Sequence, residues 1–200
     1  MYSVGIFLFH DMELLDFAGP YEVFSVTGEL NDGALRVFTI TRDGNAVKTV
    51  NGLTVLPDYG FLNHPPIDIL VIPGGVGTKA EMMRDDALRW IGEARQNAKL
   101  TMSVCSGARL LGKLGLLDEK ECTTHHEVMD TLKEIAPTAI LTRERFTGDG
   151  RLYTSAGISA GIDLSLHIVE KLFGRDVVEK TKAYMEYGDW EGDQRTPSTI

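Results

Sequence analysis

The feature that most constrains the fold of this chain is the alternation of short strand-like runs with segments of helical spacing. Strand-like runs occupy residues 2–9, 35–41, 67–72 and 100–104. The first and third are largely apolar, which is typical of strands buried on both faces of a sheet. Alternating strands and helices favour right-handed crossovers and a parallel sheet. We therefore predict an α/β fold, a flavodoxin-like three-layer sandwich with a mostly parallel sheet and helices on both faces.

The connecting segments predict six helices and two hairpins. The helices are expected near residues 19–26, 86–98, 108–113, 127–135, 159–173 and 176–185. The first should begin near Gly19, because Pro20 is tolerated only in the first turn of a helix. Asp16 would then lie just ahead of that helix. One hairpin is expected around residues 51–52 at the edge of the sheet, and a second around residues 148–150.

Composition and charge exclude several classes of protein. The chain has 20 basic and 29 acidic residues, a formal net charge of −9, which disfavours binding to nucleic acid or to an anionic membrane surface. We find neither a membrane-spanning run nor a signal peptide, so we expect a cytoplasmic protein with reduced cysteines. No Cys/His cluster has zinc spacing, and we expect no metal. Residues 1–188 are expected to form one domain, followed by a polar tail at 189–200.

The strongest chemical signal is Cys105, which stands between a predicted strand and a predicted helix. The strand, the sharp turn through Ser106 and Gly107, and the helix together have the arrangement of a nucleophile elbow. The positive end of the helix is expected to lower the pKa of the thiol below its usual value of about 8.5. A buried core cysteine is the alternative. Packing in the core is the role we expect for Cys122, which has no such context.

Two other loops follow strands and should meet the cysteine loop at the carboxyl edge of the sheet. The glycine-rich loop at residues 73–77 lacks the P-loop and Rossmann spacings. It could supply backbone N–H groups to an oxyanion hole near Gly75 and Ser106, or be a plain tight turn. Asp16, after the first strand, could be a helix N-cap or a general acid/base that faces the cysteine.

Two adjacent histidines, His125 and His126, follow a short strand predicted near residues 122–124. Either could be a proton-transfer partner of the cysteine, because histidine titrates near neutral pH. A histidine at the end of a strand also serves structural roles. The sequence leaves both alternatives open.

In their order along the chain, these motifs resemble the ThiJ/PfpI superfamily, which belongs to the class I glutamine amidotransferase-like fold. The resemblance extends from residue 4 to about residue 187. Its most specific segments are residues 15–24 and 155–163, which are similar to the branch that contains isonitrile hydratases and the ligand domains of AraC-type regulators. Ser106 departs from two patterns, since proteolytic members carry His there and hydratases usually carry Thr. We do not expect DNA binding by this chain, which has no additional helix-turn-helix segment after the resemblance ends.

The resemblance implies a cysteine-dependent hydratase that converts an isonitrile and water into an N-substituted formamide. Cys105 would form a thioimidate with the isonitrile carbon, and Asp16 would transfer the protons. Backbone N–H groups of Gly75 and Ser106 would stabilise charge. The residues expected to line the pocket are Gly74, Ser106, His125 and Ile158. No cofactor is implied.

Two other functions remain open at this point. The first is a glyoxalase-like or amidase-like enzyme that acts on small carbonyl compounds with the same nucleophile. The second is a non-enzymatic redox sensor or ligand-binding module, in which Cys105 would be oxidised. For all of them we expect a homodimer, which the resemblance implies. The apolar residues at 19–26, which lie on more than one helical face, also favour it.

Overall fold

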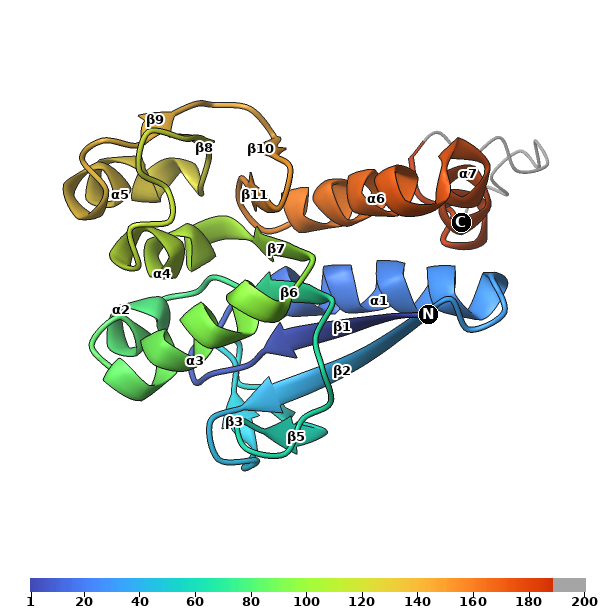
Figure 1. The fold of residues 1–200 in the computed structure, drawn as a ribbon, viewed down its shortest axis with the longest axis horizontal. Helices are drawn as coiled ribbons and strands as arrows, with labels where there is room; N and C mark the ends of the chain where they lie inside the picture. Colours follow the sequence, from blue (N-terminus) through green and yellow to red (C-terminus); the bar gives the residue numbers. More distant parts are fainter. Residues whose placement is uncertain (189–200) are drawn as a thin grey trace, which may run out of the picture.

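The computed structural model describes residues 1–188, and Figure 1 shows the order and placement of its elements. The strands are β1 (Tyr2–Phe7), β2 (Leu35–Thr41), β3 (Val47–Lys48), β4 (Thr54–Val55), β5 (Tyr59–Gly60), β6 (Ile69–Ile72), β7 (Leu100–Ser103), β8 (Glu121–Cys122), β9 (Ile140–Leu141), β10 (Phe146–Asp149) and β11 (Leu152–Ser155). The helices are α1 (Leu14–Leu30), α2 (Thr78–Glu81), α3 (Asp85–Asn97), α4 (Ala108–Lys113), α5 (Met129–Ile135), α6 (Ala160–Phe173) and α7 (Arg175–Tyr184).

The central sheet has seven strands in the order β10-β11-β7-β6-β1-β2-β5. Every neighbouring pair is parallel except β10 and β11, which form an antiparallel hairpin. Strands β1, β2, β6, β7 and β11, numbered 1 to 5 along the chain, lie in the spatial order 2-1-3-4-5. That is the flavodoxin-like order, in which the strand order reverses between β1 and β6 and ligands bind nearby. The predicted fold is confirmed.

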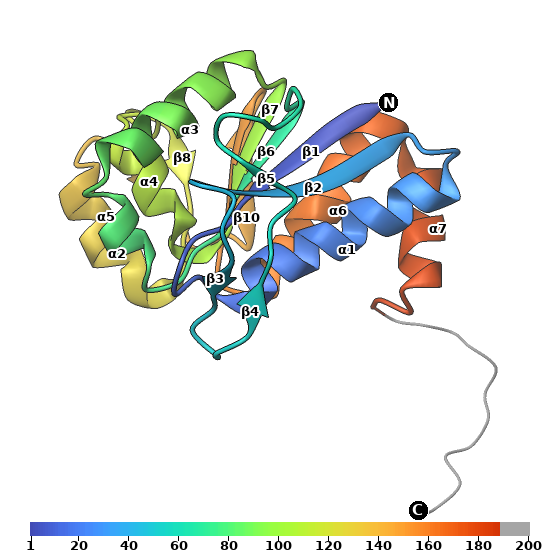
Figure 2. The ribbon, with the colours of Figure 1, turned by 90° about the horizontal axis from the view of Figure 1, so that it is seen from below.

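Helices cover both faces of the sheet, as Figure 2 shows. Helices α1, α6 and α7 pack together on one face, and α2 to α5 lie on the other. Side chains of the central strands are enclosed between these layers, and Val4, Ile6, Leu70, Ile72 and Met102 have no exposed surface. Burial on both faces explains why these strands read as continuous apolar runs.

Helix α1 begins at Leu14, before the start that was predicted near Gly19. Its N-cap is Glu13, so Asp16 lies within the first turn and is not the cap. Pro20 lies inside the helix, where its ring removes one backbone hydrogen bond. Packing of α1 against α6, α7 and β2 keeps the helix continuous through this position. Tertiary contacts therefore override the local proline signal.

The other differences from the prediction concern very short elements. The hairpin of β3 and β4 forms a separate two-stranded sheet, and β5 occupies the edge of the main sheet instead. Elements β5, β9 and α2 were not predicted, because segments of two to four residues are defined by what they pair with. The hairpin around residues 148–150 is confirmed as β10 and β11. The tail predicted at residues 189–200 lies outside the described residues.

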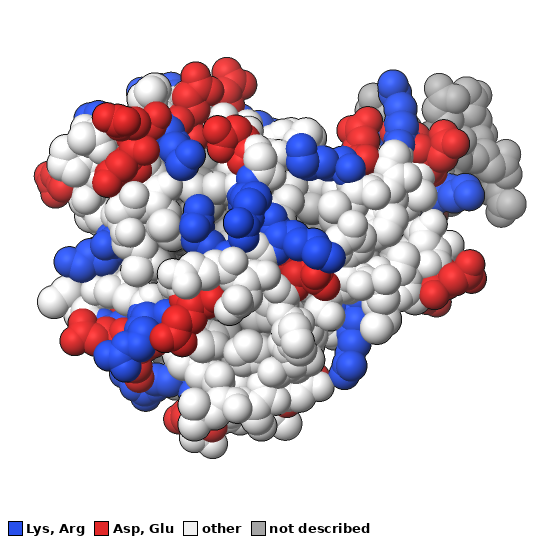
Figure 3. All heavy atoms as spheres, in the orientation of Figure 1, with Lys and Arg blue, Asp and Glu red and all other residues white. Residues whose placement is uncertain are grey.

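The surface is mixed in charge. Figure 3 shows one face on which a group of basic side chains crosses the middle, with acidic side chains on either side. The acidic excess of the sequence therefore does not produce a field of a single sign on this face. Within residues 1–188, none of the helices combines the length and apolar character that crossing a bilayer requires.

Candidate active site

Cys105 stands at a sharp turn between β7 and α4. Its φ of 56° lies in the left-handed region, which is costly for any residue other than glycine. The Cys105 N–H donates to the Ala156 carbonyl at 3.0 Å, and the Cys105 carbonyl accepts from Thr124 Oγ1 at 2.7 Å. A Cβ at Gly107 would lie 2.3 Å from the Ile72 carbonyl oxygen, so the turn needs glycine there. The chain thus has the strand–turn–helix geometry of a nucleophile elbow.

Asp16 comes from the first turn of α1 and has no exposed surface. Its Oδ2 accepts a hydrogen bond from the Gly74 N–H at 2.9 Å. Its Oδ1 has no hydrogen-bond partner of normal geometry within residues 1–188. The Cys105 thiol interacts with the same carboxyl group. The start of α1 and the loop after β6 therefore place a carboxyl group directly beside the cysteine.

Burial changes the pKa values of both groups. It raises the pKa of Asp16 to about 7, with a further rise from the charge of Glu13, while the Gly74 N–H opposes the shift. It raises the pKa of Cys105 to about 12, and the Asp16 charge adds to that rise. The predicted lowering of the Cys105 pKa is therefore wrong, because the side chain is only 7% exposed and faces a carboxylate. Burial and the neighbouring Asp16 charge therefore both oppose formation of the thiolate, and burial favours the protonated form of Asp16.

The glycine-rich loop after β6 packs tightly against the cysteine turn. Gly75 has a φ of 119°, and its N–H donates to Ser106 Oγ at 2.8 Å. The same hydroxyl donates to the Gly75 carbonyl at 3.0 Å. Donation from Gly75 to a substrate, as predicted, would therefore require Ser106 to release this N–H. The backbone amides of Ser106 and Ile158 face the Cys105 sulfur, and both lower its pKa.

A cavity of about 330 Å³ opens beside Cys105. Three of the four residues predicted to line it do so, namely Ser106, His125 and Ile158. Gly74 is not among the residues that line the cavity, and its amide donates to Asp16 instead. His125 and Ile158 also line a neighbouring cavity of about 600 Å³. The cavity beside Cys105 therefore adjoins a second, larger cavity that shares these two wall residues.

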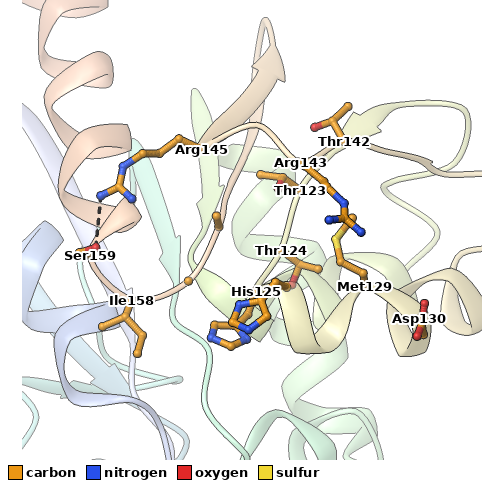
Figure 4. A pocket seen from close by; sticks show the side chains of 13 residues that line it. Thr123, Thr124, His125, Met129, Asp130, Thr142, Arg143, Arg145, Ile158 and Ser159 are labelled. Carbon is orange, nitrogen blue, oxygen red and sulfur yellow. Dashed lines mark hydrogen bonds between the residues drawn. The ribbon is translucent and has the colours of Figure 1, made fainter.

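Figure 4 shows the larger cavity, with Arg145, Ser159 and Ile158 on one side, Arg143 on the other, and His125 between the two sides. Arg145 donates to Ser159 Oγ at 3.2 Å and forms an ion pair with Asp163. Its charge is therefore largely neutralised within the protein. The cavity has room for part of a ligand that extends away from the cysteine.

His125 lies in the cavity wall without contacting the thiol through a hydrogen bond. Its Nδ1 accepts from the Glu127 N–H at 3.3 Å, which caps the turn ahead of α5. Its ring lies 4.3 Å from that of His126. Within residues 1–188, neither histidine is hydrogen-bonded to Cys105. The structural alternative for His125 fits this arrangement better than the role of thiol partner.

Comparison with known proteins identifies the family. The profile of the DJ-1/PfpI family matches residues 2–171. The chain belongs to this family. It is 33% identical over 185 residues to isonitrile hydratase of Pseudomonas putida, which covers 92% of this chain and 78% of the hydratase. It is also 29% identical over 199 residues to the HTH-type transcriptional regulator GbdR of Pseudomonas aeruginosa, and it spans about half of that protein, 54%.

Solved structures agree with this DJ-1/PfpI assignment. A ThiJ/PfpI family protein from Pseudomonas syringae matches with a TM-score of 0.85 and 26% identity, over 100% of this chain and 79% of that one. Drosophila melanogaster DJ-1beta matches with a TM-score of 0.80 over 94% and 98% of the two chains. At 21% identity the second likeness shows the fold alone. The family includes both enzymes and regulators, so membership by itself does not define this protein's activity.

One residue of this DJ-1/PfpI site was missed from the sequence. Arg109, on α4, is only 7% exposed and lines the same cavity as Cys105. Desolvation lowers its pKa. The signal was present in the sequence, since Arg109 is the one charged residue between the cysteine turn and Lys113. A charge among residues expected to be buried is unusual enough to mark a site.

Proposed function

We propose that this protein is a cysteine-dependent small-molecule hydratase whose substrate is an isonitrile. The observation that carries the proposal is the buried pair of Cys105 and Asp16, in which the Gly74 N–H holds the carboxyl group beside the thiol and burial raises the carboxyl pKa to about 7. A general acid/base works best when its pKa lies near the working pH. The 33% identity to isonitrile hydratase supports the same chemistry.

An isonitrile suits this pair because its terminal carbon both accepts the nucleophile and receives the proton. In the first step Asp16 takes the thiol proton while the Cys105 sulfur bonds to the carbon. Asp16 then returns that proton to the same carbon, and the carbon–nitrogen triple bond becomes a double bond. The product of this half-reaction is a covalent thioimidate on Cys105.

Water completes the reaction. Asp16 takes a proton from the water as its oxygen bonds to the thioimidate carbon, and that proton passes to the nitrogen. The tetrahedral intermediate then collapses, the carbon–sulfur bond breaks, and the hydroxyl proton returns through Asp16 to the sulfur. The amides of Ser106 and Ile158, which face the sulfur, stabilise the departing thiolate. The products are an N-substituted formamide and the free enzyme.

The raised pKa of the Cys105 thiol argues against a redox sensor. Redox-sensing cysteines are accessible and have low pKa values. Cys105 is buried, and its pKa is raised. Glyoxalase-like or amidase-like chemistry would use the same nucleophile, so those activities are outcomes that an experiment must separate.

A small-substrate panel tests the proposal. We expect the wild-type protein to convert cyclohexyl isonitrile to N-cyclohexylformamide, with little activity on methylglyoxal or a simple amide. Cys105→Ser should abolish turnover, and Cys122→Ser is the matched control that should retain it. Turnover of methylglyoxal in place of the isonitrile would assign the glyoxalase-like function. Isonitrile turnover that survives in Cys105→Ser would contradict the mechanism.

A further inference from the structure

We propose that Arg109 forms an anion-binding subsite beside Cys105, and that the natural substrate carries a small anionic group such as a carboxylate. The existence of the subsite is independent of the reaction. The description of the substrate as an anionic isonitrile rests on the proposed hydratase function.

The first observation is a buried charge without a counter-charge. Arg109 is 7% exposed, and buried arginines are normally paired with acids. Among residues 1–188, none of the carboxylates lies within ion-pair distance of its guanidinium. Asp16, the buried carboxyl group of the site, is bonded to Gly74 instead. Within residues 1–188 no carboxylate therefore neutralises the guanidinium, and the one titratable group whose charge acts on it is the Cys105 thiol, which burial keeps protonated more readily than a free thiol.

The second observation is that the guanidinium is held in place with donors to spare. It donates to Thr78 Oγ1 at 3.3 Å and to Thr131 Oγ1 at 3.2 Å. Both hydroxyl groups use their own protons elsewhere, Thr78 on the Gly75 carbonyl and Thr131 on the Val128 carbonyl. Two of the five N–H donors of the arginine are thus engaged by neutral groups. The planar fork keeps donors for a carboxylate, the partner that its geometry matches.

The third observation is the location. Arg109 and Cys105 line one cavity of about 330 Å³, which lies at the small end of ligand pockets. The cavity also contains Glu13, Lys79 and Glu127, which are half-buried or exposed and therefore better screened by water. A carboxylate bound to Arg109 would hold a short substrate with its reacting carbon close to the sulfur. A long or bulky neutral substrate gains nothing from this arrangement.

Paired alkylating reagents test the subsite without any assumption about the reaction. Iodoacetate and iodoacetamide have the same leaving group, but iodoacetate carries a carboxylate where iodoacetamide carries a neutral amide. We would measure the alkylation rate constant of Cys105 with each reagent at pH 8 by peptide mass mapping, and divide the value for iodoacetate by the value for iodoacetamide. The same ratio for N-acetylcysteine is the free-thiol reference. Both reagents attack the same thiolate, so a change in the thiol pKa cancels from the ratio. The net charge of −9 would by itself disfavour iodoacetate.

We expect the wild-type ratio to exceed that of the free thiol by about tenfold or more, as a charge-assisted hydrogen bond allows. Arg109→Gln should return the ratio to the free-thiol value, and Arg109→Lys should retain part of the preference. Arg89→Gln removes an exposed positive charge on α3 and is the matched control, with an unchanged ratio expected. A wild-type ratio equal to or below that of the free thiol overturns the subsite, whether or not the variants fold.

A second measurement separates failure of the subsite from failure of the hydratase. The values of kcat/KM for isocyanoacetate and for its ethyl ester would be compared in the wild-type protein and in Arg109→Lys. If the wild-type protein prefers isocyanoacetate to its ethyl ester and Arg109→Lys reduces that preference, both proposals are supported. An alkylation ratio that depends on Arg109, without turnover of either isonitrile, supports the subsite and contradicts the hydratase. If the two isonitriles are turned over equally and the alkylation ratio at Cys105 equals that of N-acetylcysteine, the subsite is contradicted and the hydratase is not.

Discussion

The two cysteines of this protein have similar burial and very different surroundings. Cys105 is 7% exposed and Cys122 is fully buried, and burial raises the pKa of the first to about 12 and of the second to about 11. Cys105 has a left-handed backbone, a carboxyl neighbour and a cavity. Cys122 lies in the regular strand β8, and the one charged group that affects its pKa is Lys133. Burial therefore does not distinguish a nucleophile from a packing residue, whereas the carboxyl partner and the cavity do.

The difference also shows where the fold accepts unfavourable local structure. The Cys105 backbone is strained, and Asp16 buries an oxygen without a normal hydrogen bond. Such costs persist at functional sites because the surrounding structure fixes them. The strand that contains Cys122 has no comparable feature. The contrast between the two sites can be tested by changing one group at a time.

The largest expected effect is loss of turnover in Cys105→Ser. Removing the sulfur nucleophile should lower kcat by at least ~1000-fold, since the covalent step then has no good nucleophile. Cys122→Ser should keep kcat within about twofold once the folded fraction is corrected by circular dichroism, as expected for a side chain that makes no contact with substrate. Equal losses in the two variants would remove the distinction between the cysteines.

Asp16→Asn should lower turnover by about 100-fold, the usual contribution of general acid/base catalysis. The asparagine can still accept from the Gly74 N–H, so the fold should persist. Asp86→Asn, on the exposed face of α3, is the control for a lost carboxylate. A folded Asp16→Asn variant with wild-type kcat would reduce Asp16 to a structural residue.

The same substitution should make Cys105 more reactive toward iodoacetamide while catalysis is lost. Because the Asp16 charge raises the pKa of the thiol, removing it lowers that pKa and increases the thiolate fraction below it. We expect about tenfold faster labelling at pH 8, corresponding to a shift of about one pKa unit. In the wild-type protein the labelling rate should still be rising with pH between 7 and 9.

Mass mapping of both cysteines at each pH checks this prediction. Cys105, which lines the cavity, should be labelled well before Cys122 in every case. Slower labelling of Cys105 in Asp16→Asn would mean that Asp16 promotes the thiolate instead of opposing it.

The smallest expected effect is a twofold change in particle mass. Val76 and Ile158 line the Cys105 cavity and are 55% and 38% exposed, and Leu15 and Tyr21 on α1 are 37% and 36% exposed. We expect a second copy of the chain to cover these exposed apolar side chains in a homodimer with a two-fold interface. Light scattering at micromolar concentration should give about twice the mass of one chain, and Tyr21→Glu should reduce it. A monomer mass for the wild-type protein would contradict the expectation.

The fold could be predicted from the sequence because its central strands are largely apolar and alternate with segments of helical spacing. The positions of Asp16, the glycine-rich loop and Cys105 at one edge of the sheet followed from the same alternation. The start of α1 could not be predicted, because local propensity places Pro20 in a first turn while packing against α6 and α7 extends the helix ahead of it.

The electrostatics of the site were also beyond the sequence. A helix N-terminus after Cys105 indicates a lowered thiol pKa, but the opposing carboxylate of Asp16 comes from a segment far away in the chain. Likewise, the engagement of Gly75 by Ser106 depends on how two loops meet. Arg109 was visible as a charge in an apolar helix, yet only the structure shows that it has no acidic partner among residues 1–188.

The central claim is that Cys105 is the nucleophile of the reaction and that Cys122 takes no part in it. The most direct test follows isonitrile turnover and the extent of alkylation of each cysteine in the same samples during limited treatment with iodoacetamide. The account predicts that the remaining activity equals the fraction of unmodified Cys105 at every time point, while Cys122 stays unmodified. Activity that persists after complete modification of Cys105, or that declines only as Cys122 is modified, would contradict it.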